Sequence, residues 1–349
     1  MKVLFATGNS PDYLAGTLWD GLRSALGPDN VADAVDSAYL RGLHEDWSGP
    51  DPSAVLLVSD LTRDDPLGRG KSCDTHRLPA SGEDDFDLLV ATTSFLRDQD
   101  WQWLADLRGR RLKKGGKLAW VETLDSPAEI FPPPFGVDAV FRREIDPAVP
   151  YEARYGRKPL PLLGAAPRRW FDWPQENKDI DVFAVSSAVT PLPGFPQRWE
   201  ALRKVFETLT KHTCLAGSGR FDLPDYLKYL CRSRLCVVAP GGGESSDGPR
   251  QWEAVAAGAI PVFVSQPCRV RWPWFSYQNT VGAHCFFSSA AHALPSIIDG
   301  ALKENLPAVL ARLREHALAF HTTEARAGQF LALVGSDAWK KWDQKPWCW

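Results

Sequence analysis

Residues 235–265 read LCVVAPGGGESSDGPRQWEAVAAGAIPVFVS, and they are the most informative part of the sequence about the fold of the chain. The apolar run at 235–239 predicts a buried strand, and the apolar run at 260–264 predicts a second one. Between the two runs the sequence predicts a helix that begins at Pro249 and ends before Gly258. A strand, a helix and a further apolar strand in this order are typical of a parallel sheet.

Three consecutive glycines, Gly241, Gly242 and Gly243, follow the first of these strands. Because glycine has no side chain, its backbone N–H groups can approach an oxyanion closely, and the start of the next helix adds a partial positive charge. Arg250 can form two hydrogen bonds to phosphate oxygens, and Glu253, on the same helix face, can accept bonds from ribose hydroxyls. Glycines alone would also fit a flexible surface loop. The prediction of a diphosphate site therefore depends on the whole series in this order: a strand, the glycines, Arg250, Glu253, the glycine that ends the helix, and a second apolar strand.

Short apolar strands alternate with amphipathic helices over the rest of the chain. The further strands are expected at residues 2–7, 54–59, 87–92, 117–123, 139–142, 181–187 and 213–216. The further helices are expected at residues 12–26, 98–107, 197–212 and 223–233, and within 289–334. A stretch rich in proline, arginine and aromatic residues at 147–176 is expected to link two series of similar size. We therefore expect an α/β fold of two Rossmann-like domains, at 1–165 and 166–320, and a helical tail at 321–349 that can pack back on the first domain.

Composition narrows the class of protein. The chain has 349 residues, a net charge of −3, 44% hydrophobic and 24% charged residues, which is ordinary for a folded protein of two domains and gives no overall sign of nucleic-acid binding. Its 7 cysteines include no CxxC pair, which argues against a zinc site and a disulfide scaffold. The start of the chain does not have the pattern of a signal peptide, and no apolar run approaches the ~20 residues that span a bilayer. We expect a cytoplasmic protein without a membrane span.

The glycine segment resembles the donor-binding segment of GT-B glycosyltransferases, and most closely that of the exostosin-like and spore-maturation CgeB-like groups. The resemblance rests on the three glycines, on Arg250-Gln251-Trp252-Glu253 and on Gly258-Ala259-Ile260-Pro261-Val262. The run Asn9-Ser10-Pro11-Asp12-Tyr13-Leu14, followed by Gly21-Leu22-Arg23, is similar to the start of CgeB-like proteins.

This resemblance implies two domains that face each other across a cleft, with a nucleotide-sugar donor in the carboxyl half and an acceptor in the amino half. It implies that Arg250 contacts the diphosphate and Glu253 the ribose of a UDP- or GDP-type donor, without a metal or another cofactor. The sequence has no convincing Asp-x-Asp motif near a strand end, which fits a site without metal. Exostosin-like enzymes have a serine shortly before the arginine. Here Ser246 is near, but Gly248-Pro249 intervene, so its role stays open.

Other polar residues follow expected strands, at the edge where parallel sheets bind ligands. The candidates for a base that takes the proton of an acceptor hydroxyl are Asp12, Asp60 and Glu122. The further candidates for donor contacts are Ser186, Ser218 and Arg220. Helix caps and turns use the same residue types, so the sequence leaves both explanations open.

We therefore expect an enzyme that moves a sugar from a nucleotide-sugar to an acceptor hydroxyl. The acceptor is left open among a glycan, a small molecule and a nucleic acid, and so is the oligomeric state. A dense basic run at 108–117 and 15 tryptophans indicate, as an alternative, a DNA glycosyltransferase acting on hydroxymethylated bases, although a solvated helix end explains the basic run more simply. A non-catalytic nucleotide-sugar-binding protein and a GT-B-type epimerase are further alternatives.

Overall fold

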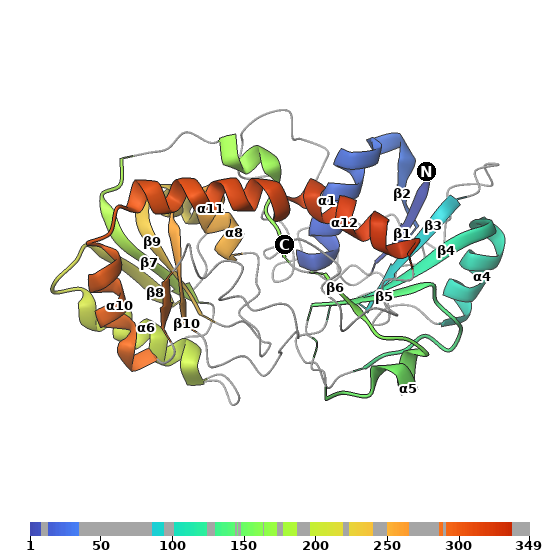
Figure 1. Cartoon of the computed structure of the whole chain (residues 1–349), viewed down its shortest axis with the longest axis horizontal. Coiled ribbons are helices and arrows are strands. Elements are labelled where there is room, and N and C mark those ends of the chain that lie inside the picture. Colours follow the sequence, from blue (N-terminus) through green and yellow to red (C-terminus); the bar gives the residue numbers. More distant parts are fainter. Residues whose placement is uncertain are drawn as a thin grey trace, which may run out of the picture. The chain divides into compact units, whose positions relative to one another are not determined.

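The computed structural model alternates strands with helices along the chain (Figure 1). It describes residues 1–7, 13–34, 86–93, 101–123, 130–143, 145, 148–162, 164–172, 177–186, 196–218, 223–239, 250–264, 286–288 and 291–336. The described elements form two compact units. Unit 1 runs from β1 (Val3–Ala6) to β6 (Leu160–Pro161) and includes the last helix, α12 (Thr323–Val334). Unit 2 runs from the 3-10 helix η4 (Arg168–Asp172) to α11 (Leu306–Phe320).

The sheet of unit 1 is parallel throughout its described strands, in the order β2-β1-β3-β4-β5-β6. Its other strands are β2 (Val31–Asp33), β3 (Phe86–Thr92), β4 (Leu112–Glu122) and β5 (Ala139–Arg142). All four residues of β1 are buried, which is the continuous apolar pattern of a strand covered on both faces. Because β1 lies between β2 and β3, the strand order reverses beside β1, and such a reversal is where open α/β sheets bind ligands.

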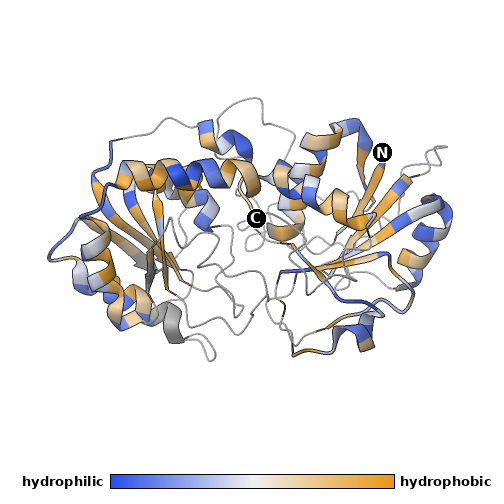
Figure 2. Ribbon diagram, in the orientation of Figure 1, coloured by the Kyte–Doolittle hydropathy of each residue, from blue (hydrophilic) through white to orange (hydrophobic). Residues whose placement is uncertain are grey.

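Helices bury apolar residues against this sheet, and the same helices carry hydrophilic residues between the apolar ones (Figure 2). On one face, α1 (Tyr13–Leu26) presents leucines that recur every four residues, and α12 packs beside it. These leucines are Leu14, Leu18 and Leu22. A second cluster of core residues includes Leu104 and Leu107 of α4 (Trp101–Arg111). The short elements of unit 1 are η1 (Pro28–Asn30) and α5 (Tyr151–Tyr155).

The first and last helices of unit 1 approach each other closely at Gly21. A Cβ atom at this position would lie 2.0 Å from the Thr323 carbonyl oxygen and 3.0 Å from the Cβ of Ala327. Next to it, Asp20 Oδ2 accepts a hydrogen bond of 2.7 Å from the Thr323 hydroxyl. The absence of a side chain at Gly21 is therefore what allows α12 to pack on α1.

The described sheet of unit 2 is also parallel, in the order β11-β10-β9-β7-β8. Its strands are β7 (Ile180–Ser186), β8 (Cys214–Ser218), β9 (Ser233–Val238), β10 (Ile260–Val264) and β11 (Phe286–Ser288). From β7 the chain goes first to β8 on one side and then to β9 on the other. The order of strands therefore reverses between β7 and β9, which is the topological switch point of this doubly wound sheet.

Two groups of helices pack on the sheet of unit 2 (Figure 1). In one group, α6 (Pro196–Thr208) contacts α10 (Leu294–Ala301) and the short η5 (Ala291–Ala293). In the other, α8 (Arg250–Ala256) contacts α11, β9 and β10, while α7 (Leu223–Arg232) contacts β7 and β9. None of the helices in the described ranges is both long and apolar enough to cross a membrane, and α11 has only 15 residues.

The expected α/β class with two parallel sheets and a helical carboxyl-terminal segment is confirmed. The strand expected at 54–59 lies outside the described residues. Three short strands, β2, β6 and β11, were not expected. The stretch expected to be a linker, 147–176, contains the boundary between the two units at positions 163 and 164, but it also includes α5, β6 and η4, and β6 pairs with β5 in the sheet of unit 1.

The contact at Gly21 predicts opposite effects of the same substitution at two helical glycines. Gly21→Ala should destabilise the protein by about 1–3 kcal/mol, because the new methyl group overlaps the Thr323 carbonyl. Gly328→Ala, at an exposed position of α12, meets no atom within 4 Å and should stabilise the protein by up to about 1 kcal/mol. Urea unfolding of both variants measures the effect, and equal stability of the two variants would contradict this account of the packing.

Candidate donor-binding site

Arg250 lies at the topological switch point of unit 2. It is the first residue of α8, and its Nη1 donates a hydrogen bond of 2.8 Å to the Val185 carbonyl oxygen. Val185 is the penultimate residue of β7, so this bond holds the guanidinium at the carboxyl end of the strand beside which the order reverses. A guanidinium has five N–H donors, and one bond to a carbonyl leaves further donors for a ligand.

Glu253 follows one helical turn later and is held by a tyrosine of the neighbouring helix. The Tyr226 hydroxyl, on α7, donates a hydrogen bond of 2.9 Å to Glu253 Oε2. Burial raises the pKa of Glu253 above its usual 4.5, although the hydrogen bond from Tyr226 and the charge of Arg250 act in the opposite direction. The carboxylate is thus kept in a poorly solvated place, which makes an additional hydrogen-bond donor from a ligand favourable.

The same tyrosine also affects the pKa of Arg250, so the cation and the carboxylate share one neighbour. Burial opposes the charged form of Arg250, but its interactions with Tyr226, Cys236 and Glu253 outweigh this effect and raise its pKa. Burial raises the pKa of Tyr226 well above its usual 10, and it raises the pKa of Cys236 to about 12. At neutral pH the cluster therefore presents a guanidinium, a neutral phenol and a neutral thiol.

The helix that carries Arg250 and Glu253 is fixed from behind. Trp252 is 1% exposed and stacks on His321, with ring centroids 3.7 Å apart and planes at 10°. Arg314 of α11 donates a hydrogen bond of 2.8 Å to the Ala256 carbonyl oxygen at the end of α8, and another to the Phe171 carbonyl oxygen. Gly258, with φ of 83°, follows the helix in the left-handed conformation expected of a terminating glycine.

The serines expected near the donor lie at the same edge of the sheet. Ser186 ends β7, Ser218 ends β8, and the two residues are paired in register. Their backbones are therefore close to Val185 and to the guanidinium it binds. The other predicted donor residues, Gly241, Gly242, Gly243, Ser246 and Arg220, lie outside the described residues.

The structure argues against Glu122 as the catalytic base. The side chain ends β4 as expected, but it is 0% exposed and forms an ion pair with the buried Arg142. The Phe131 amide donates a further hydrogen bond of 2.8 Å to Glu122 Oε1. A carboxylate with a fixed counter-ion and no contact with solvent is a structural group rather than a proton acceptor. The other two candidates, Asp12 and Asp60, lie outside the described residues.

Two features at the carboxyl-terminal edges of the two sheets were not predicted from the sequence: Tyr226 in unit 2 and two pairs of threonines in unit 1. Tyr226 precedes its partner by 27 residues and stands in an amphipathic helix, so no local pattern marks it. In unit 1, the hydroxyls of Thr7 and Thr92 lie 2.9 Å apart beside the reversal of strand order, and those of Thr93 and Thr123 lie 2.8 Å apart. The sequence signal that could have revealed these threonine pairs is a threonine at or directly after the end of an apolar strand.

Comparison with known proteins adds the class of fold. No protein-family model matches the sequence, and no curated protein matches it either. Among solved structures, an α-glucosyltransferase in complex with UDP and a 13-mer DNA containing a central A:G mismatch is similar, with a TM-score of 0.56 and 11% identity over 96% of this chain and 98% of that chain. A structure of trehalose-6-phosphate synthase is similar with a TM-score of 0.52 and 11% identity over 96% of this chain and 99% of that chain.

These similarities identify the fold. With its two parallel sheets and its carboxyl-terminal helical segment, the chain has the fold of the GT-B glycosyltransferases. The alignments include 96% of this chain and nearly all of both similar structures, so the similarity extends over both units and not over a single Rossmann-like half.

The raised pKa of Glu253 predicts how its substitution changes stability with pH. The folded protein keeps a proton on Glu253 at pH values where the unfolded chain has lost it, so the stability from this proton is lost as the pH rises through the folded pKa. Glu253→Gln cannot ionise. Its unfolding temperature, relative to wild type, should therefore be higher at pH about 8 than at pH about 5.

Differential scanning calorimetry at both pH values measures this difference. Glu315→Gln, at an exposed position of α11, provides the control for the loss of one carboxylate. A difference for Glu253→Gln that stays constant with pH would contradict the raised pKa.

Proposed function

We propose that this chain is a metal-independent glycosyltransferase that moves a sugar from a UDP- or GDP-type nucleotide-sugar to an acceptor hydroxyl. The observation that carries the proposal is the Arg250–Tyr226–Glu253 cluster at the switch point of the second unit of a GT-B fold. Such a point is where doubly wound sheets bind nucleotides. The presence of UDP in the similar α-glucosyltransferase supports a uridine donor.

In this proposal Arg250 neutralises the diphosphate. The bond between the sugar carbon and the diphosphate oxygen breaks while a bond to the acceptor oxygen forms, so negative charge grows on the departing diphosphate. A guanidinium held by the Val185 carbonyl stabilises this charge without moving during the reaction. The glycines Gly241, Gly242 and Gly243, and the residues Ser186, Ser218, Arg220 and Ser246, would supply the neighbouring donor contacts.

Glu253 would bind the ribose of the donor. Its Oε2 already accepts from Tyr226, which leaves Oε1 and the remaining lone pair of Oε2 for the ribose hydroxyls. Tyr226 is then a positioning residue, because it acts on the ribose only through Glu253. The proton of the acceptor hydroxyl needs a base, for which Asp12 and Asp60 are the proposed candidates.

The domain roles and the narrower grouping are also part of the proposal. Residues 166–320 would bind the donor, residues 1–165 the acceptor, and residues 321–349 would form the helical tail. The Arg250–Glu253 motif and the strand after Gly258 support an exostosin-like or CgeB-like grouping. The described cysteines are free thiols, which supports a reducing compartment such as the cytoplasm.

Donor binding predicts a thermal shift that depends on Arg250. UDP or GDP at about 100 times its Kd should stabilise the wild type by about 2.7 kcal/mol, and EDTA should not diminish this effect. Arg250→Ala should weaken binding by about 10- to 100-fold, because it removes charge-assisted hydrogen bonds. Arg234→Ala, whose arginine pairs with Asp181 and lies near the start of β9, is the matched control and should bind as wild type.

A shift of equal size in both variants would contradict a donor site at Arg250. Product analysis of wild type separates the alternatives. Transfer to an acceptor, or slow hydrolysis of the donor, supports the enzyme. Tight donor binding without either reaction would indicate a non-catalytic binding protein, and an isomerised sugar formed without acceptor would indicate an epimerase.

The role of Tyr226 predicts an effect that depends on the ribose. Tyr226→Phe keeps the ring that packs near Phe183 but removes the hydrogen bond to Glu253, so the Kd for UDP should rise about tenfold. With 2′,3′-dideoxy-UDP the loss should be clearly smaller, because Glu253 then has no hydroxyl to accept from and only the effect of Tyr226 on Arg250 remains. Tyr229→Phe on the same helix is the control. Isothermal titration calorimetry measures the Kd of each ligand. An equal loss of affinity for both ligands would mean that Tyr226 does not act through the ribose.

A further inference from the structure

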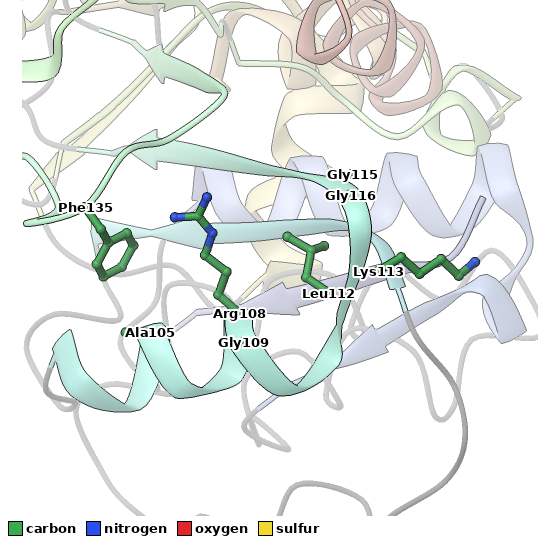
Figure 3. A pocket seen from close by; sticks show the side chains of 8 residues that line it. All are labelled: Ala105, Arg108, Gly109, Leu112, Lys113, Gly115, Gly116 and Phe135. Atoms are coloured by element: carbon green, nitrogen blue, oxygen red, sulfur yellow. The ribbon is translucent and has the colours of Figure 1, made fainter.

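Unit 1 contains a pocket of about 420 Å³ at the start of β4 (Figure 3). We call it the basic pocket. It is lined by Ala105, Arg108, Gly109, Leu112, Lys113, Gly115, Gly116 and Phe135. Arg108 and Lys113 are its two charged lining residues, and both are cations. The pocket lies at the amino-terminal edge of the sheet, because Glu122 is at the other end of β4, roughly 17 Å beyond Lys117.

A bulge in β4 forms one wall of the pocket. Phe86 pairs with Leu112 and Leu88 pairs with Lys117, so β4 contains three more residues than β3 between these pairs. Gly115 has φ of 84°, and a Cβ at Gly116 would lie 2.8 Å from Leu112 Cδ1. Two glycines are therefore needed for a bulge that brings Lys113 and Lys114 to the exposed surface.

Positive charge exceeds negative charge around the pocket. Residues 108–117 include six cations and no acid, namely Arg108, Arg110, Arg111, Lys113, Lys114 and Lys117. Three carboxylates offset part of this charge. Asp106 lies 4.0 Å from Arg110, Asp87 lies 2.8 Å from Lys113, and Asp138 lies 3.6 Å from Lys117. Within the part of the chain that the structure describes, Arg108 and Lys114 form no ion pair.

Arg108 and Phe135 lie beside each other in the pocket (Figure 3). The Arg108 guanidinium carbon is 5.9 Å from the centre of the Phe135 ring, and Arg108 Nη1 donates a hydrogen bond of 2.9 Å to the Gly136 carbonyl oxygen. That bond orients the guanidinium and uses one of its five donors. A positioned guanidinium next to a ring that lines a cavity suits a ligand with an anionic group and a flat apolar face.

Each nucleotide of a single-stranded nucleic acid has both features, because its phosphate is anionic and its base is flat and largely apolar on its faces. We propose that the basic pocket binds single-stranded nucleic acid, with a base against Phe135, the adjoining phosphate at Arg108 and the next phosphate near Lys114. Stacking on an aromatic ring together with cations along the backbone is the general mode of such binding. A helix dipole explains arginines in the last turn of α4, but it explains neither the cavity nor the lysines of the bulge. The proposal is independent of glycosyl transfer, since all of its contacts lie within unit 1.

The test is anisotropy of a labelled single-stranded DNA of mixed sequence, titrated with the full chain in the absence of donor. Two phosphate contacts predict that the Kd rises about sevenfold between about 50 and about 200 mM salt. Lys114→Ala should weaken binding about fivefold and reduce the slope of log K against log salt by about 0.7. Phe135→Leu should weaken binding about tenfold without changing that slope.

Lys228→Ala, at an exposed position of α7, is the control and should bind as wild type. Because Lys114 is exposed and has no ion pair with a described residue, its substitution tests the proposal even if Phe135→Leu loses stability. Equal binding by wild type and Lys114→Ala would overturn the proposal. It would also be overturned if inorganic polyphosphate competed as well as DNA while Phe135→Leu bound normally, or if anionic lipid vesicles bound and DNA did not. A normal UDP thermal shift in Lys114→Ala would separate this result from the donor site.

Discussion

The parallel pairing of β7 with both β8 and β9 is the constraint on which the candidate site of unit 2 depends. In a parallel sheet every strand ends at the same edge, and every connection must cross a face of the sheet, usually as a helix. Where the order reverses, connections leave in opposite directions and do not cover the strand ends. The Val185 carbonyl lies at this place, and Arg250 uses it to fix its guanidinium. The position of the cation thus follows from topology.

Two arrangements of an arginine and a glutamate in the molecule differ in how completely the two charged groups are paired. In unit 1, Glu122 and the buried Arg142 satisfy each other, and the Tyr155 hydroxyl accepts a further hydrogen bond of 2.8 Å from Arg142. In unit 2, Glu253 and Arg250 interact across Tyr226, and burial still raises the pKa of the carboxylate. A group that remains poorly solvated in the free protein gains more from a ligand than a group that is already paired.

The cluster needs support because α8 is too short to be stable by itself. An isolated helix of 7 residues does not form in water, so tertiary contacts must hold it. Trp252 stacks on His321, and Arg314 binds the carbonyl oxygen of Ala256 at the end of the helix. These contacts come from the end of α11 and its middle. The long helix α11 therefore stabilises the helix that carries Arg250 and Glu253.

Local sequence patterns are sufficient to predict most of the elements and the class of fold. Continuous apolar runs such as residues 260–264 identify parallel strands, the spacing of Leu14, Leu18 and Leu22 identifies α1, and Gly258 ends α8 in the conformation that favours glycine. These properties are local, because each depends on residues within a few positions of one another. The three-residue spacing of Arg250 and Glu253 is local in the same sense, so the pair could be found without a structure. Strands as short as β6 carry too few residues for any pattern.

The contacts of each polar group, by contrast, follow from how the elements pack in three dimensions. Tyr226 reaches Glu253 across 27 residues, and Arg142 reaches Glu122 across 20, so one carboxylate is oriented in the candidate site and the other is neutralised in the core. The sequence predicted a ribose contact for Glu253 and a candidate base at Glu122, but it could not show that Glu122 is paired with Arg142 in the core. The difference arises because a pKa, an ion pair and a hydrogen bond depend on distance and burial in space, which strand order and packing establish after the local elements have formed.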